Sequence, residues 1–163
     1  MAYDIKKHLQ YNAWASNKIV EALLTLEEGL WDKEVISSFP SVRKTVFHIW
    51  DAEQIWLKRL QGESPSNWPS KSFTGSTADI VKAFMENTNA LTSFVEQQDS
   101  SFWSKTFTYK NMKGVEFSSK ADEILYHLVN HATFHRGQLV TMLRQLGVSQ
   151  FQPQDLIAYV RQL

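Results

Sequence analysis

The chain has 163 residues, of which 43% are apolar and 21% charged, values typical of a globular protein and not of a disordered one. Its 17 basic and 17 acidic residues cancel, which argues against a nucleic-acid partner, because binding to phosphates requires a basic excess. The absence of cysteine excludes disulfides, thiolate metal ligands and a cysteine nucleophile.

The length predicts one domain over residues 1–163. The first residues, MAYDIKKHLQYNAW, lack the continuous apolar stretch of a signal peptide, and no run approaches the ~20 apolar residues of a membrane span. We therefore expect a soluble, cytoplasmic protein without a membrane partner. Six tryptophans beside only six glycines and four prolines are typical of long helices around an aromatic core.

The first half of the chain predicts two amphipathic helices. Apolar residues recur at helical spacing over residues 4–28, and Gly29 is the expected end of that helix. After the connector LWDKEVISSFP, Pro40 with Ser41 is the expected start of a second helix that runs to about Gln61, with Gly62 as its stop signal. The polar, Pro/Gly/Ser-rich residues 62–76 predict a crossover loop.

A third helix is predicted over residues 77–98, beginning with a cap formed by Ser76 and Asp79. The segment FWSKTFTYKNMKGVEFSSK then predicts a short hairpin in which Phe107–Tyr109 pairs with Val115–Phe117.

Ser119 is the expected cap of a fourth helix that runs to Leu146 and stops at Gly147, and Pro153 is expected to open a short C-terminal helix, DLIAYVRQL. Four helices of ~20–25 residues have matching lengths of ~30–38 Å. The sequence therefore predicts an all-α four-helix bundle with a long crossover between its second and third helices.

The fourth helix contains the most informative segment, EILYHLVNHATFHRGQL, with histidines at positions 127, 131 and 135. Residues four apart lie one above the other on a helix, so two such imidazoles can bind one ion. Three cannot do so comfortably, because the helix rises ~12 Å over eight residues. Spacing alone allows either the pair His127/His131 or the pair His131/His135. On the second helix, His48 borders the core face marked by Ile49 and Trp56, and is the candidate third ligand.

These residues occur in segments that resemble the DinB/YfiT-like family of metal-binding four-helix bundles. The similar segments are YNAWASNKIV, HIWDAEQIWLKRL, the run TYKNMKGVEFSSKADEILYHLVNHATFHRGQL and the final DLIAYVRQL. Ser16 departs from the commonest form of the first motif, whereas the ending N-H-x-x-x-H-R-G-Q is the most specific. The resemblance implies an up-down-down-up bundle and assigns the metal to His48, His131 and His135, with His127 as a neighbour.

The resemblance also implies nickel or zinc as the metal, a homodimer, and activity in some relatives as transferases or isomerases that use a low-molecular-weight thiol cofactor. A three-histidine site with open positions can lower the pKa of bound water or of a thiol. We therefore hypothesise a metal-dependent thiol S-transferase or hydrolase acting on a small-molecule substrate. The alternative is a non-enzymatic metal-binding or stress-response protein that acts through its dimer.

Four further residues have hypothetical roles. Asp51 and Gln138, each one turn from a histidine, are candidates to orient a ligand ring. Arg136 is expected to pair with an acidic residue on a neighbouring helix, and Gly137 to permit close helix approach.

Overall fold

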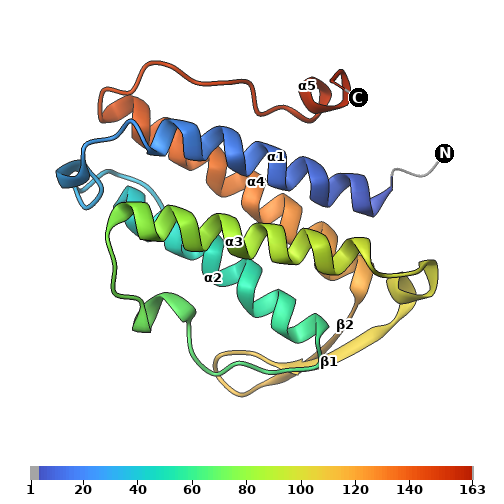
Figure 1. Cartoon of the computed structure of the whole chain (residues 1–163). Coiled ribbons are helices and arrows are strands. Elements are labelled where there is room, and N and C mark those ends of the chain that lie inside the picture. Colours follow the sequence, from blue (N-terminus) through green and yellow to red (C-terminus); the bar gives the residue numbers. More distant parts are fainter. Residues whose placement is uncertain (1–3, 163) are drawn as a thin grey trace.

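The computed structural model describes residues 4–162. Its long helices are α1 (Ile5–Leu23), α2 (Val42–Leu60), α3 (Thr77–Glu96) and α4 (Ala121–Gln145). α3 and α4 each pack against both α1 and α2, so helices that are consecutive at the start of the chain lie diagonally across the bundle. α1 and α4 run in one direction and α2 and α3 in the other (Figure 1). The predicted up-down-down-up four-helix bundle is confirmed.

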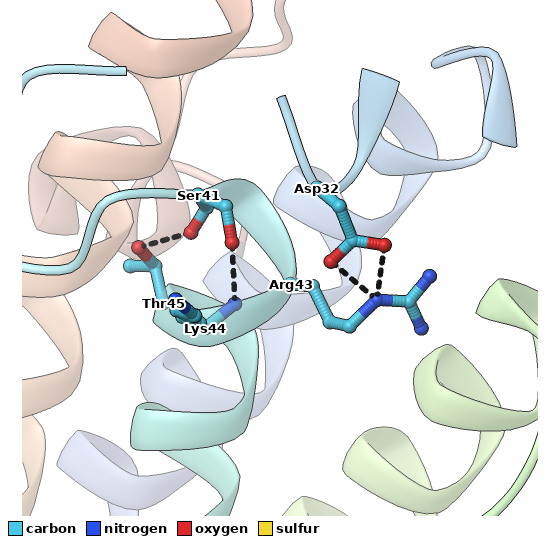
Figure 2. A network of polar contacts seen from close by, with 5 residues as sticks. All are labelled: Asp32, Ser41, Arg43, Lys44 and Thr45. Carbon is cyan, nitrogen blue, oxygen red and sulfur yellow. Dashed lines mark hydrogen bonds and ion pairs between the residues drawn. The ribbon is translucent and has the colours of Figure 1, made fainter. Parts of the chain in front are cut away.

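The predicted start of α2 is also confirmed, and a local polar network explains it. Ser41 has an extended backbone, and its Oγ accepts a hydrogen bond from the Lys44 backbone N–H at 3.3 Å. The Thr45 hydroxyl donates to the Ser41 carbonyl at 3.0 Å. Beside this cap, Arg43 Nε lies 2.8 Å from an oxygen of Asp32 and ties the preceding connector to the helix (Figure 2). The cap satisfies backbone groups that the first helical turn leaves unpaired.

Three connectors contain short elements. η1 (Glu28–Leu30) lies between α1 and α2, and η2 (Pro69–Ser72) lies in the predicted crossover loop, which returns along the bundle from the end of α2 to the start of α3. The predicted Ser76/Asp79 capping box begins α3. After η3 (Ser100–Ser104), the hairpin lies beside the end of α2 and the start of α4 (Figure 1).

α1 ends at Leu23, five residues before the predicted end of its helix. The Thr25 hydroxyl donates to the Ala22 carbonyl at 2.8 Å. The backbone N–H groups of Thr25 and Leu26 donate to the carbonyls three residues earlier, not four. Such local bonds compete with helical bonding. The resulting turn leaves Leu24 exposed and lets Leu26 reach the core.

The predicted hairpin forms, but its second strand was placed wrongly. β1 (Thr106–Lys110) pairs with β2 (Glu116–Lys120), and Tyr109 lies opposite Phe117. Asn111 Oδ1 accepts from the N–H groups of Lys113 and Val115, so Val115 belongs to the turn. Gly114 supplies the positive φ of +79° that this turn requires.

The predicted cap at Ser119 is wrong, because Ser119 is paired within β2. The strand continues directly into α4 after Lys120, whose N–H donates to the Glu123 carboxylate at 2.9 Å. At its other end α4 stops as predicted before Gly147, which has a φ of +96°.

The C-terminal helix is shorter than predicted. α5 covers Leu156–Val160, and residue 163 lies outside the described residues. The Gln154 carbonyl accepts a hydrogen bond from the Tyr11 hydroxyl at 3.0 Å, so the preceding segment binds α1 as extended chain. α5 itself lies beside α1 (Figure 1).

The apolar core consists of two clusters, one at each end of the bundle. Of the six tryptophans, Trp31 and Trp50 are buried in it, and the other four are half-buried, three of them packed against the second cluster. No helix within residues 4–162 is both long and apolar enough to cross a bilayer.

Candidate metal centre

Three of the histidines singled out in the sequence converge between α2 and α4. His48 comes from α2, and His131 and His135 come from successive turns of α4. These two helices pack against each other, and histidines four residues apart share one face. His135 is buried, and the other two are half-buried. The site therefore depends on a contact between helices distant in the sequence.

The separation of the ring nitrogens suits one ion. Nε2 of His131 lies 2.8 Å from Nε2 of His48, and one ring nitrogen from each histidine lies within 4.8 Å of the others. Two nitrogens bound to the same ion at about 2.0–2.1 Å can be at most about 4.2 Å apart. The first pair meets this limit, and the separations that involve His135 exceed it by at most about 0.6 Å.

The electrostatics keep these rings neutral. Burial, reinforced by the nearby His135, lowers the pKa of His48 to about 4. Burial and the three neighbouring histidines lower the pKa of His131 to about 3. At neutral pH both rings are therefore unprotonated on one nitrogen, which is the form that binds metals.

Two neighbouring side chains hold the histidines in place. Nδ1 of His135 lies 2.7 Å from Oε1 of Gln138, so Nδ1 carries the proton and Nε2 is left to bind an ion. The amide nitrogen of Gln138 donates in turn to the Ser38 hydroxyl at 2.9 Å. The ring of Phe39 stacks on His48 with centroids 4.1 Å apart. The structure thus gives Gln138 the orienting contact hypothesised for it, and the α1–α2 connector closes one side of the site.

The other hypothesised residues have different contacts. The two carboxylate oxygens of Asp51 accept hydrogen bonds from the N–H and hydroxyl of Ser70, at 2.8 and 2.6 Å. Asp51 thereby anchors the crossover loop to α2. His127 lies outside the cluster, with its ring edge-on to Trp56 at 5.6 Å. Gly137 does not permit a close helix approach, since a Cβ placed there would have nothing within 4 Å.

Sequence reasoning missed a polar layer that crosses the bundle between the two apolar clusters. Arg136 Nη1 donates to the Asn12 side-chain oxygen at 2.6 Å, and Asn12 donates to Glu53 at 2.9 Å. Thr88 donates to the other oxygen of Glu53 at 2.6 Å. Arg136 thus reaches an acidic residue on another helix as expected, but through Asn12. Arg136 follows His135 in the sequence, so this polar layer also fixes the α4 backbone at the histidine cluster.

A cleft of about 440 Å³ lies beside the cluster and shares His48 with it. Its other walls come from the α1–α2 connector, α2 and the crossover loop; they are Phe39, Lys44, Phe47, Asp51, Trp68, Ser70 and Lys71. A larger cleft of about 760 Å³ lies between α4 and residues 151–156 and includes none of the three histidines. Proximity to the metal centre makes the smaller cleft the candidate substrate site.

The chain resembles known proteins over most of its length. The sequence profile of the DinB family matches residues 1–159. Protein DinB of Bacillus subtilis (strain 168) is 25% identical over 148 residues, which cover 86% of this chain and 85% of that protein.

Two solved structures share the fold. A DinB-like protein from Bacillus cereus has a TM-score of 0.67 at 17% identity, covering 89% of this chain and 95% of its own. YfiT from Bacillus subtilis, described as a probable metal-dependent hydrolase with an unusual four-helix bundle topology, has a TM-score of 0.68 at 15% identity. That match covers 91% of each chain. At such identities the structural likeness concerns the fold alone.

Proposed function

This chain belongs to the DinB family, and we propose that it is a metal-dependent enzyme whose divalent ion, nickel or zinc, is bound by His48, His131 and His135. The reaction is hydrolysis of a small molecule or transfer of a thiol to it. The description of YfiT as a probable metal-dependent hydrolase supports the first reaction. Because this chain has no cysteine, thiol transfer requires a separate low-molecular-weight thiol.

The observation that carries the proposal is the cleft that shares His48 with the histidine cluster. A closed structural metal site has four protein ligands, whereas a catalytic one keeps a position open for water or substrate. Here three candidate ligands converge, and a cleft within the ~300–1,000 Å³ range of small-molecule sites lies next to them. This arrangement favours an enzyme over a protein that only stores or senses the ion.

The residues have separate roles in this proposal. A bound divalent ion would lower the pKa of water or of a thiol, producing a nucleophile near neutral pH. The three histidines would hold the ion, and Gln138 fixes which nitrogen of His135 is left to bind it. Phe39 covers one face of His48 and limits the access of water from that side.

The first test is metal content by mass spectrometry on protein purified without an affinity tag or added metal. His131→Ala is expected to abolish stoichiometric binding. His127→Ala is the matched control, because it removes a histidine from the same helix but lies outside the cluster. About one nickel or zinc ion per chain, lost only in the first variant, would support the site and justify screening ester hydrolysis and thiol transfer. Equal losses in both variants, or no metal in the wild type, would refute it.

We also propose the homodimer that the resemblance implies. Light scattering during size-exclusion chromatography should then give a mass twice the 18.9 kDa of one chain. A mass of one chain at micromolar concentration would exclude it.

A further inference from the structure

The cleft beside His48 has an unusual combination of walls. Three aromatic side chains, Phe39, Phe47 and Trp68, line it together with two lysines, Lys44 and Lys71. The lysines belong to different segments, since Lys44 is in the first turn of α2 (Figure 2) and Lys71 is in η2 of the crossover loop. An apolar cleft with a few charged groups is the usual form of a small-molecule site.

Neither of these lysines has an acidic partner. Within residues 4–162, the lysines in ion pairs are Lys18, Lys58 and Lys82. Lys44 and Lys71 are both exposed and are in none of these pairs. Their ammonium groups are therefore available to a ligand.

The single acidic group in the cleft does not cancel this charge. Asp51 is only 6% exposed, and both of its carboxylate oxygens accept hydrogen bonds from Ser70. The accessible charge of the cleft is positive.

The aromatic walls indicate the shape of the ligand. Phe39 stacks on His48 at an interplanar angle of 28°, so a flat aromatic surface lines the boundary between the cleft and the metal centre. Trp68, which is half-buried, adds a second aromatic group from the crossover loop. Planar apolar groups pack well against such rings.

We propose that this cleft binds a small anion with a planar apolar body, with the anionic group near Lys44 and Lys71 and the body against Phe39, Phe47 and Trp68. The inference rests on the proposed function in that the bound molecule is the substrate of the metal centre. It adds the chemical class of that substrate, an aromatic or similarly flat carboxylate, phosphate or sulfonate.

The probe for the test is 2-naphthalenesulfonate, compared with the uncharged 2-naphthalenemethanol, which has the same rings. A sulfonate is a weak metal ligand, so its affinity reports on the lysines and not on the ion. Calorimetric titrations use the protein as purified and after removal of metal by a chelator. Because the metal-free protein is measured too, the cleft is tested even if the proposed metal site fails.

We expect the wild type to bind the sulfonate about tenfold more tightly than the alcohol at low salt, from contacts with two exposed ammonium groups. Lys44→Gln/Lys71→Gln should reduce that preference to near unity. The control Lys7→Gln/Lys33→Gln removes two exposed lysines that do not line the cleft and should retain it. Raising the ionic strength to about 0.15 M, where the screening length is about 8 Å, should weaken sulfonate binding only.

Trp68→Ala provides an independent readout of the apolar wall. It should lower the affinity for both probes by a similar factor, roughly three- to tenfold. Trp14→Ala replaces a half-buried tryptophan outside the cleft and should change neither affinity. Equal affinities of the wild type for the two probes, or equal losses in the two double-lysine variants, would overturn the proposal. So would an unchanged affinity for both probes in Trp68→Ala.

Discussion

Replacing Arg136 by methionine should destabilise the protein severely, because it breaks the polar layer inside the bundle. Arg136 is 2% exposed and donates to Asn12, Ser16 and Thr133. Methionine fills similar volume but leaves Asn12 Oδ1 without its charged donor. It also leaves Glu53, which is 1% exposed, without the positive charge that compensates it.

Removing one member of a buried charged pair costs about 3–5 kcal/mol. For a chain of this length, such a loss lowers the melting temperature by roughly 6–20 °C. The assay is urea unfolding followed by circular dichroism, with Arg144→Met as the control. Arg144 is exposed on the same helix, and its guanidinium lies 5.2 Å from the ring centre of Phe151, so its replacement should cost under about 1 kcal/mol.

The pH dependence of the free energy of unfolding tests whether the loss of stability in Arg136→Met comes from Glu53. Burial raises the pKa of Glu53, and the charge of Arg136 opposes that rise. Without Arg136 the pKa of Glu53 is higher still. A carboxyl group with a raised folded-state pKa contributes stability that is present below its unfolded pKa and is lost as pH rises through the folded pKa. The deficit of Arg136→Met relative to the wild type should therefore be larger at about pH 8 than at about pH 5.

Adding Glu53→Gln should recover part of the loss, since coupled residues typically show interaction energies of about 0.5–3 kcal/mol. A cost within 1 kcal/mol of the Arg144→Met control would refute the reasoning. Strict additivity of the two changes, or a deficit independent of pH, would equally contradict it.

The remaining predictions concern the metal centre and the glycines. Gln138→Leu should weaken metal binding by about 10–100-fold in competition with a chelating dye, because His135 loses its orienting partner; an unchanged affinity would rule that role out. Asp51→Ala should cost about 1–3 kcal/mol in urea unfolding and leave metal affinity unchanged, because its hydrogen bonds anchor the crossover loop; weaker metal binding would instead support a role in orienting a ligand. Gly147→Ala should cost about 1–2 kcal/mol at its φ of +96°, whereas Gly137→Ala, inside α4 with open space around it, should stabilise by up to about 1 kcal/mol. Equal effects of the two alanines on the melting temperature would contradict the assigned backbone conformations.

The sequence predicts the helices well because their stripes of apolar residues are long and their caps are local. Ser76 could be identified as a cap from Asp79 three residues later, and Ser41 as part of a helix start; both hydroxyl oxygens accept a capping hydrogen bond. Two of the errors occur where a side chain competes with the backbone for hydrogen bonds over a few residues. Thr25 ends α1 early, and Asn111 shifts the second strand of the hairpin. Periodicity carries no information on such bonds.

The candidate site could be located from the sequence, but the spacing of the histidines alone does not decide which of them bind the ion. Histidines four residues apart predict a pair of metal ligands. The choice between His127 and His135 depends on where α2 crosses α4, and the spacing of residues along α4 gives no information on that crossing point. The polar layer left a signal that was not used. Glu53 lies one turn after Ile49 on the core stripe of α2, and a charged residue on such a stripe requires partners inside the bundle.

In the proposed function, different parts of the fold bind the ion and the substrate: α2 and α4 supply the histidines, and the crossover loop supplies part of the cleft. The histidines are on helices whose positions depend on the entire core, so few changes are tolerated there. Lys71 and Trp68 are on a connector outside the core, where the entropic cost of added residues rises only slowly with length. Selection can therefore lengthen or rewrite this loop without dismantling the bundle. Under the proposed function, such changes would alter which molecule the cleft binds and leave the three histidines in place.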